Sequence, residues 1–352
     1  MENKKDAECI LSVIVPVYNM ASEDRLIWCM NSLLYQERIE NYEVIAVDDC
    51  STDDSLTILR ALECEHADRL HVLHSEVNRH QGGAKNLGLK AARGKWIAFI
   101  DADDWVVSDY FARLLQKAEE TGADCVGTDY CIVSEHTMQP GRVVANGSPE
   151  QTGKLNDAKR RLLLLDSGSL CVKIYRREIV VDCPSRFPED IFYEDNALAG
   201  SWIMRMQHYE YVPGPLYYYY QHEDSTVHTV TKKRLEDRLS AGRMMLEEAK
   251  KYGFLERFRP ELEYSFTVLF YKNTVFSALQ EMKEKGVCSF VTQTAKEMKE
   301  TFPDFQSNPY YQMRTNPEEK KLMRMQMENP LGFYLYYRML WLYRRIRYRH
   351  RG

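Results

Sequence analysis

Four short, nearly continuous apolar runs are spaced along the first hundred residues. They occupy residues 11–18, 42–47, 70–73 and 96–100. Apolar runs of this length without polar alternation are typical of strands that are buried on both faces. Helical patterns lie between these runs. The first covers residues 22–36, the second ends at about residue 65 with Ser51 or Thr52 as its N-cap, and the third ends at residue 92. This alternation predicts an α/β fold with a doubly wound, mostly parallel sheet.

The pattern is less regular after residue 104. We expect a helix to about residue 120, a strand at 124–134, a loop or lid at 139–157, a short strand at 171–175, a helix at 196–206 and two short strands around a turn at 209–220. From residue 231 the pattern is helical, with one long polar loop at 302–318. These observations predict a sheet-containing catalytic domain over residues 1–230 and a helical region over residues 231–352.

Aspartate side chains follow two of the predicted strands directly. Asp48 and Asp49 end the second strand, and Asp101 and Asp103 end the fourth. In open α/β sheets, ligands bind in the crevice outside the carboxyl ends of the strands. We therefore expect the four carboxylates to share one crevice.

Each aspartate pair has a functional and a structural interpretation. Asp101 and Asp103 would repel each other unless a hard cation such as Mg²⁺ or Mn²⁺ bound them, with phosphate oxygens completing its ligands. Asp48 and Asp49 could accept hydrogen bonds from a nucleotide base or a ribose. The alternatives are that the first pair caps the following helix and that the second forms an Asx turn.

Two further segments carry candidate chemistry. Gly82 and Gly83 would let the backbone approach a ligand, and the nearby Lys85 could reach a phosphate, although the chain has no P-loop. The pair 194–195 (Glu-Asp) begins a predicted helix, where a carboxylate can act as a general base or complement the helix dipole. A near-copy, the pair 189–190, lies just before it, and spacing alone does not decide between them.

Five motifs in this order resemble those of the family 2 glycosyltransferases, which are inverting nucleotide-sugar enzymes of the GT-A fold. The motifs occupy residues 12–19, 47–53, 82–88, 99–104 and 193–196. Each motif is modest, but the five together, in matching strand context, are highly specific. The segment 173–178 resembles the branch of the family that builds bacterial capsule, exopolysaccharide and lipopolysaccharide chains.

The resemblance implies roles for individual residues. Asp49 would contact the uracil of a UDP-linked donor, Lys85 would neutralise its diphosphate, and Asp195 would be the catalytic base. Asp101 would bind the ribose or a metal-bound water, and Asp103 would bind the Mn²⁺ or Mg²⁺ itself. The full nucleotide-binding set that we expect is Pro16, Val17, Tyr18, Asp48, Asp49, Gly83, Lys85, Asp101, Ala102, Asp103, His222 and Ser225. The metal ligands would be Asp101 and Asp103, and Glu194 would accompany Asp195 in catalysis.

Two residues depart from the family pattern. Cys50 stands where the family usually has Gly, which affects the turn after the aspartate pair. Lys85 stands where the family usually has Arg, so the bidentate fork is lost while a point charge remains. His222 and Ser225 lie where the family often places a loop that closes over the diphosphate, and a surface turn is the alternative.

The implied reaction is a single displacement that inverts the anomeric centre. Asp195 would take the proton of an acceptor hydroxyl as that oxygen attacks the donor sugar. The alternative function is a non-catalytic assembly partner that binds a nucleotide sugar or a glycan with the same fold. A sugar nucleotidyltransferase would need a basic, Gly-rich loop near the first strand, which residues 16–19 do not supply.

The amino-acid composition restricts the expected binding partners and the expected location of the protein. The formal net charge is −5, which argues against a nucleic-acid binder. The nine cysteines form no C-x-x-C pair, so reduced thiols in a cytoplasmic protein are expected. The first eight residues lack the apolar core of a signal peptide, and no run approaches the length of a membrane span.

The last segment differs from the rest of the chain. From Asn329 onward there is no acidic residue, and aromatic residues are frequent over residues 333–343. Its six arginines are Arg338, Arg344, Arg345, Arg347, Arg349 and Arg351. We expect a helix that lies on an anionic membrane at its cytoplasmic face, which suits a lipid-linked glycan acceptor. A solvated basic helix packed on the protein, or a dimer contact, is the alternative.

Overall fold

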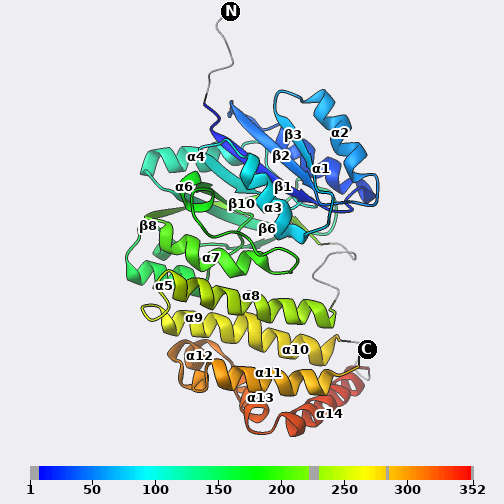
Figure 1. The fold of residues 1–352 in the computed structure, drawn as a ribbon, viewed down its shortest axis with the longest axis vertical. Helices are drawn as coiled ribbons and strands as arrows, with labels where there is room; N and C mark the ends of the chain where they lie inside the picture. The colour runs from blue at the N-terminus through cyan, green and yellow to red at the C-terminus, as the bar shows by residue number, and fades with distance from the viewer. Residues whose placement is uncertain (1–7, 222–229, 283–284, 350–352) are drawn as a thin grey trace, which may run out of the picture. The chain divides into compact units, whose positions relative to one another are not determined.

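The computed structural model describes residues 8–221, 230–282 and 285–349. Contacts divide the chain into two compact units, residues 1–225 and 226–352. The first unit holds a sheet with helices around it, and the second is helical (Figure 1).

Ten strands of the described residues form one sheet in the first unit. Their order is β3-β2-β1-β4-β9-β6-β10-β5, with β7 beside β6 and β8 beside β10. The strands are β1 (Leu11–Val17), β2 (Tyr42–Asp48), β3 (Leu70–His74), β4 (Trp96–Phe99), β5 (Trp105–Val106), β6 (Cys125–Val133), β7 (Arg142–Val144), β8 (Gly153–Lys154), β9 (Lys173–Arg176) and β10 (His208–Tyr220).

The central strands explain the continuous apolar runs. Every residue of β1, β2 and β4 is buried, since helices cover both faces of this part of the sheet. Strands β3, β2, β1 and β4 are parallel to one another, whereas β9 is antiparallel to both β4 and β6. The predicted α/β fold with a mostly parallel sheet is confirmed, and the parallel strands bring the ends of β1, β2 and β4 to one edge.

Seven α-helices of the described residues belong to the first unit. They are α1 (Arg25–Leu34), α2 (Ser55–Glu65), α3 (His80–Ala91), α4 (Tyr110–Thr121), α5 (Asp157–Leu165), α6 (Arg177–Val180) and α7 (Glu194–Arg205). The expected N-cap of α2 at Ser51 or Thr52 is wrong, because the helix begins three residues later. Ser51 Oγ instead accepts from the Asn19 N–H at 3.0 Å, and Asn19 Oδ1 accepts from the Thr52 N–H at 2.8 Å. These side chains join the loop after β1 to the loop after β2.

Two predictions about the later part of this unit are corrected. Residues 139–157 are not one loop, since they include β7, a 3₁₀ turn (Pro149–Gln151) and β8. Residues 209–220 belong to the single strand β10 rather than to two strands. Its pairing with β6 is irregular around Val212 and Pro215, because proline cannot donate to the ladder, but the strand continues beyond them.

The second unit is built from helices whose inner faces are aromatic. They are α8 (Lys232–Lys251), α9 (Arg259–Ser265), a π-helical turn (Phe266–Lys272), α10 (Asn273–Gln280), α11 (Val287–Thr301), a 3₁₀ turn (Phe305–Ser307), α12 (Pro309–Arg314), α13 (Pro317–Glu328) and α14 (Pro330–Arg349). Phe266, Phe270 and Tyr271 are almost fully buried among them.

The polar loop expected at residues 302–318 is mostly helical. Its polar residues are helix caps, since the Asn308 side chain accepts from the Tyr310 N–H at 2.9 Å and the Asn316 side chain accepts from the Glu319 N–H at 2.9 Å. A proline follows each asparagine at the first helical position. Asparagine followed by proline is therefore a helix-start signal here.

Candidate functional site

The loop after β2 holds two buried carboxylates in different ways. Asp48 Oδ2 lies 2.9 Å from His74 Nδ1, while Asp48 Oδ1 is buried without a hydrogen-bond partner. The Asp49 carboxylate accepts from the Arg79 N–H, at 3.0 and 3.2 Å, and burial raises its pKa. The Asp49 N–H donates to Val17 O at 2.8 Å, which ties the loop to the end of β1.

Cys50 occupies a position that favours glycine. Its φ is +61°, in the left-handed region that L side chains rarely adopt. A Cβ atom at this position costs backbone strain that a glycine would avoid.

Asp101, Asp103 and Asp104 form the loop after β4. Asp101 Oδ2 accepts from Cys171 Sγ at 3.4 Å, and Asp101 Oδ1 is buried without a hydrogen-bond partner. Burial raises the pKa of Asp101 to about 6, against the opposing effect of Lys85. Asp104 is 1% exposed and accepts from Tyr217 Oη at 2.5 Å and from the Tyr220 N–H at 2.9 Å. Asp104 thereby anchors this loop to β10, a role that the D-x-D pattern did not reveal.

The donor set suits only one kind of cation site. Within the described ranges, no group of three or more His, Cys, Asp or Glu side chains is arranged to hold a metal ion. Asp101 and Asp103 supply two carboxylates, and Asp101 keeps one oxygen without a hydrogen-bond partner. Such a pair fits Mg²⁺ or Mn²⁺ that takes its remaining ligands from a diphosphate and water, and it does not fit a cation held by protein alone.

Gly82 and Gly83 are needed for packing. Both lie in the first turn of α3, which starts at His80, so the glycine-bearing stretch 80–88 is helical rather than a loop. A Cβ on Gly82 would clash with the carbonyl oxygen of Pro188, and a Cβ on Gly83 would clash with Arg79 Cβ. The absence of side chains therefore lets the segment before α7 lie directly against α3.

Lys85 is committed to a buried ion pair. Its side chain is 3% exposed, and Nζ lies 2.6 Å from Glu194 Oε1, whose side chain is 5% exposed. Burial by itself would lower the pKa of Lys85, but Glu194, with smaller contributions from Asp101 and Asp195, holds it above its ordinary value. The ion pair links α3 to the first turn of α7, and sequence reasoning did not foresee it.

Asp195 stands beside this ion pair at the start of α7. Its Oδ1 accepts from the Asn196 N–H and from Asn196 Nδ2, both at 2.8 Å. Burial, followed by the neighbouring Glu194 charge, raises the pKa of Asp195. A half-buried carboxylate with a raised pKa has the properties of a general base.

The near-copy of this pair has a different environment. Glu189 Oε2 lies 2.8 Å from Arg79 Nη1 in an ion pair exposed to solvent, and Glu189 Oε1 accepts from Asn86 Nδ2 at 3.2 Å. Asp190 is exposed, with φ at +62°. The residues alone left the choice between the two pairs open. Asp195 of the second pair lines a cavity.

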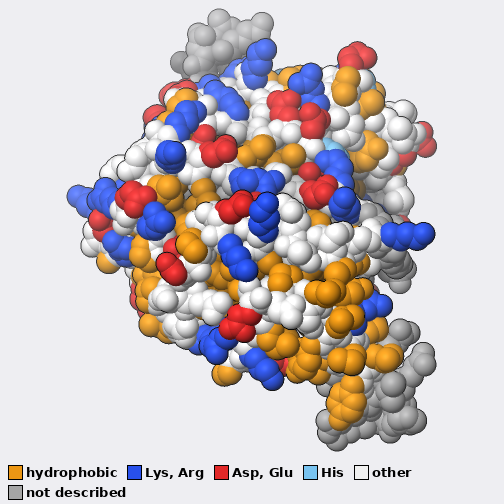
Figure 2. Space-filling view, turned by 60° about the horizontal axis from the view of Figure 1, so that its bottom comes forward, with side chains coloured by type: hydrophobic (Ala, Val, Ile, Leu, Met, Phe, Trp, Pro, Cys, Tyr) orange, Lys and Arg blue, Asp and Glu red, His pale blue; other side chains and the backbone are white. Residues whose placement is uncertain are grey.

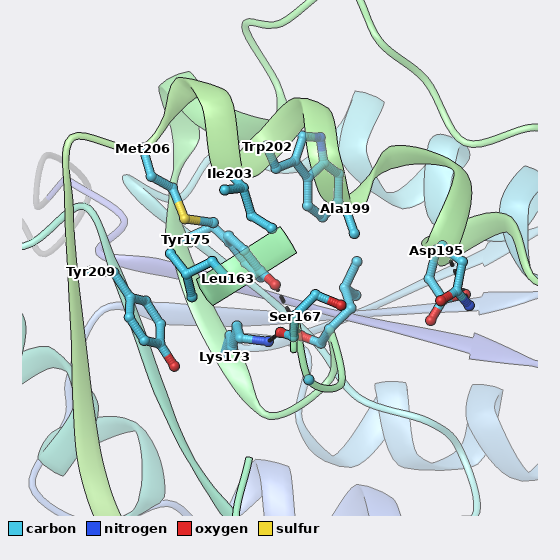
Figure 3. A pocket seen from close by; sticks show the side chains of 13 residues that line it. Leu163, Ser167, Lys173, Tyr175, Asp195, Ala199, Trp202, Ile203, Met206 and Tyr209 are labelled. Atoms are coloured by element: carbon cyan, nitrogen blue, oxygen red, sulfur yellow. Dashed lines mark hydrogen bonds between the residues drawn. The ribbon is translucent and has the colours of Figure 1, made fainter. Parts of the chain in front are cut away.

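That cavity lies along one face of α7 and has a volume of about 30 Å³ (Figure 3). Helix α7 contributes residues at one helical face, and β9, β10 and the segment 167–170 close the other sides. Its lining includes Asp195, Ala199, Trp202, Ile203, Met206, Lys173, Tyr175 and Tyr209. Sequence reasoning named only Asp195 among these.

The other predicted site residues are spread around the same sheet edge. Pro16 and Val17 are buried at the end of β1, Tyr18 is 43% exposed just after it, and Ala102 is buried in the loop after β4. His222 and Ser225 lie outside the described residues. The described residues include all nine cysteines, and none of them forms a disulfide in this structure.

Comparisons with known proteins show the family of this chain. The model of the family described as glycosyl transferase family 2 matches residues 12–182. The putative glycosyltransferase EpsH of Bacillus subtilis is 32% identical over 284 residues, which are 78% of this chain and 78% of that relative. This chain belongs to glycosyltransferase family 2. The uncharacterized glycosyltransferase EpsJ of the same organism is 32% identical over 65% of this chain, and the match spans 66% of EpsJ, just under two thirds of its length.

A solved structure extends the likeness to the fold of this family 2 member. The crystal structure of residues 1–349 of S. aureus TarS in complex with UDP-GlcNAc matches with a TM-score of 0.66 at 21% identity. The match covers 92% of this chain and 89% of that one. The predicted GT-A fold, with a C-terminal helical region, is thereby confirmed.

Proposed function

We propose that this chain transfers a sugar from a UDP-linked donor to a hydroxyl group of a glycan or lipid-linked glycan, with inversion, in the synthesis of a surface polysaccharide. The observation that carries the proposal is the position of Asp195. It is a half-buried carboxylate with a raised pKa, and it lines a cavity. It interacts electrostatically with Lys85, whose pKa Asp101 also raises. One relative is a Bacillus spizizenii poly(ribitol-phosphate) beta-glucosyltransferase, and a matching TarS structure contains UDP.

The donor would be held at the edge where β1, β2 and β4 end. Asp49 offers a carboxylate for a base N–H, and Pro16, Val17 and Tyr18 offer the surface beside it. Asp101 and Asp103 would hold Mn²⁺ or Mg²⁺, which when bound neutralises the charge of a departing diphosphate. A related structure, that of PcManGT from Pyrobaculum calidifontis, contains GDP-Man and Mn²⁺.

Asp195 would accept the proton of the acceptor hydroxyl. When ionised, a carboxylate with a raised pKa is a better proton acceptor than an ordinary aspartate. Glu194 would hold the first turn of α7 in place through Lys85. In this arrangement Lys85 acts as a positioning residue, and its ammonium charge still faces the acidic edge.

The first experiment is a thermal-shift series with UDP, GDP, CDP and dTDP, each with and without Mn²⁺. A ligand that binds only the folded state raises the midpoint of unfolding. We expect a Mn²⁺-dependent shift with UDP in the wild type and none in Asp103→Ala. A shift accompanied by no sugar transfer to any acceptor would favour the non-catalytic binding partner. No shift with any nucleotide would contradict the proposal.

We also propose that α14 binds an anionic membrane surface. One face of this helix packs inside the second unit, where Phe333 is 1% exposed and Tyr337 Oη accepts from Gln280 Nε2 at 2.6 Å. The other face exposes Leu331, Leu335, Met339 and Leu342, and Figure 2 shows apolar side chains gathered at the lower right, where this helix lies. Among the described residues, no helix is both long and apolar enough to cross a membrane.

A pair of substitutions tests this surface without removing the packed face. Leu335→Ser with Leu342→Ser should weaken binding to vesicles of anionic lipid, while the midpoint of thermal unfolding stays close to that of the wild type. Neutral vesicles are the control, because the arginines of this segment attract only an anionic surface. Equal binding of variant and wild type to anionic vesicles would refute the proposal.

A further inference from the structure

The cavity beside Asp195 is too small for a sugar ring. Its volume of about 30 Å³ is enough for about two water molecules. It therefore suits a substituent of a few atoms rather than a whole pyranose. Because Asp195 lines it, a group that fills it would lie next to the hydroxyl that Asp195 is proposed to deprotonate.

A buried cation stands at one side of this cavity. Lys173, on β9, is 5% exposed, and its ammonium donates to Ser167 O at 2.6 Å and to Ser169 O at 2.7 Å. An ammonium has three protons, so one donor position is left over. Within the described ranges, no ion pair joins Lys173 to a carboxylate. Burial lowers the pKa of Lys173 to about 8, although the charge of Asp195, which lines the same cavity, opposes this effect. The group is thus a cation at neutral pH that forms no direct ion pair in the described part of the chain.

Other polar atoms of the lining also lack partners. Trp202 Nε1 and Tyr209 Oη are buried, and neither has a hydrogen-bond partner among the described residues. Figure 3 shows Lys173, Ser167 and Tyr209 on one side of the cavity, with Trp202, Ile203 and Ala199 of α7 on the other. It is unfavourable to bury a cation with a spare donor position, together with two polar groups that lack partners, unless something binds there.

We propose that this cavity is an acceptor subsite for a compact anionic substituent, the carboxylate of an acidic sugar, which Lys173 binds. The inference rests on the proposed function and adds to it the chemical class of the acceptor. A carboxylate has only three heavy atoms, so it fits the volume of the cavity. It only accepts hydrogen bonds, so it suits the donors of the lining that lack partners. Charge-assisted hydrogen bonds of this kind are stronger than neutral ones.

The test compares two soluble probes that differ only in this group. D-glucuronate and D-glucose are titrated into the full chain with UDP and Mn²⁺ present, and binding is followed by ligand-observed NMR. We expect glucuronate to bind at least about tenfold more tightly than glucose. Glucose 6-phosphate is a third probe, and tighter binding of the phosphate than of the carboxylate would overturn the assignment to an acidic sugar.

Two variants separate binding from structure. Lys173→Met removes the charge, and Ala199→Leu fills the cavity from α7 while Lys173 keeps its bonds to the two carbonyl groups. Both should lose the preference for glucuronate, whereas Lys90→Met, on the exposed side of α3, should keep it. An undiminished preference in Ala199→Leu would overturn the proposal even if Lys173→Met failed to fold.

The outcome is independent of the donor site. A UDP-dependent thermal shift without any preference for glucuronate would refute this subsite and leave the proposed function standing. Loss of the UDP shift itself would count against the proposed function instead. In transfer assays with a matched pair of glucuronide and glucoside acceptors, Lys173→Met should raise KM for the glucuronide alone, whereas a merely structural role would lower kcat for both.

Discussion

The pairs Glu189–Asp190 and Glu194–Asp195 have the same two residue types in the same order, yet they have different environments. In the first pair, the glutamate meets an arginine at the surface and the aspartate faces solvent. In the second, the glutamate is buried against Lys85 and the aspartate lines a cavity. Position relative to α3 and α7, not residue type, separates a surface ion pair from a candidate catalytic group.

The basic residues that pair with the two glutamates also have different environments. Arg79 immediately precedes α3 and Lys85 lies within it, and each contacts the glutamate of one pair. Water screens the first ion pair, whereas the second lies in the protein interior, where an unpaired charge is costly. The substitutions below use each pair as the control for the other.

The largest difference is expected from the two aspartates. Asp195→Asn should lower the rate of sugar transfer by about 10²–10⁴-fold, because the amide cannot accept the acceptor proton. Binding of UDP, followed by thermal shift, should persist. Asp190→Asn should change the rate by no more than about threefold, as expected of an exposed residue outside the site.

This comparison can fail in a way that is easy to recognise. If Asp190→Asn were the inactive variant and Asp195→Asn retained activity, the assignment of the base would be wrong. The near-isosteric amide keeps the shape of each side chain, so both variants should unfold close to the wild-type temperature. A large fall in that temperature would instead point to a structural role.

The next largest effect is on stability. Lys85→Met should lower the free energy of unfolding by about 3–5 kcal/mol, because Glu194 is left charged and buried without its partner. Arg79→Met should lower it far less, since water can solvate Glu189. Urea denaturation of both variants measures the difference, and a double variant, Lys85→Met with Glu194→Leu, should recover much of the loss.

Equal losses in Lys85→Met and Arg79→Met would contradict this contrast. They would mean that the Lys85–Glu194 ion pair is open to water despite its burial. A Lys85→Met variant that stayed stable but no longer bound UDP would return Lys85 to the phosphate-binding role implied by the sequence.

A smaller effect is expected on the pH dependence of transfer. Burial raises the pKa of Asp195 and the Glu194 charge adds to it, while Lys85 opposes both. The acidic limb of kcat/KM should therefore lie above the usual aspartate range, because the base works only when ionised. Glu194→Gln removes the Glu194 charge and should shift the acidic limb of kcat/KM to lower pH. Glu189→Gln should leave this limb in place.

The direction in which the free energy of unfolding changes with pH gives an independent check on the raised pKa of Asp195. A carboxyl group whose pKa is higher in the folded than in the unfolded state binds more protons when folded. Asp195 should therefore make the protein less stable as pH rises from the ordinary aspartate value through its folded value. Asp195→Asn should remove this contribution, and a pH series of unfolding free energies that is the same for variant and wild type would contradict the shift.

Much of the sheet edge that we propose as the donor site could be predicted from local sequence. The apolar runs of β1, β2 and β4 predict buried parallel strands, and Asp49 and Asp101 follow them directly, so their common edge follows from topology. The cavity that we propose as an acceptor subsite was less predictable. Its lining combines Lys173 of β9 with Trp202 of α7, and local sequence does not reveal that β9 lies between β4 and β6.

Local signals also misled where tertiary contacts decide the outcome. Gly82 suggests a ligand-binding loop, but it is helical and glycine is required by the carbonyl of Pro188, more than a hundred residues away. Asn308 and Asn316 suggest a polar loop, but each caps a short helix that packs on an aromatic core. A sequence pattern shows which conformations are allowed, and the contacting segment selects among them.

The smallest effect separates backbone strain from charge in the exposed pair. Asp190 has a φ of +62°, where a Cβ atom is strained and glycine is not. Asp190→Gly should raise the free energy of unfolding by about 0.5 kcal/mol, since relief of strain is partly offset by the greater entropy of unfolded glycine. Asp190→Ala removes the same carboxylate but keeps the Cβ atom, so it should be less stable than Asp190→Gly. Equal stability of these two variants would show that the turn before α7 carries no strain at Asp190.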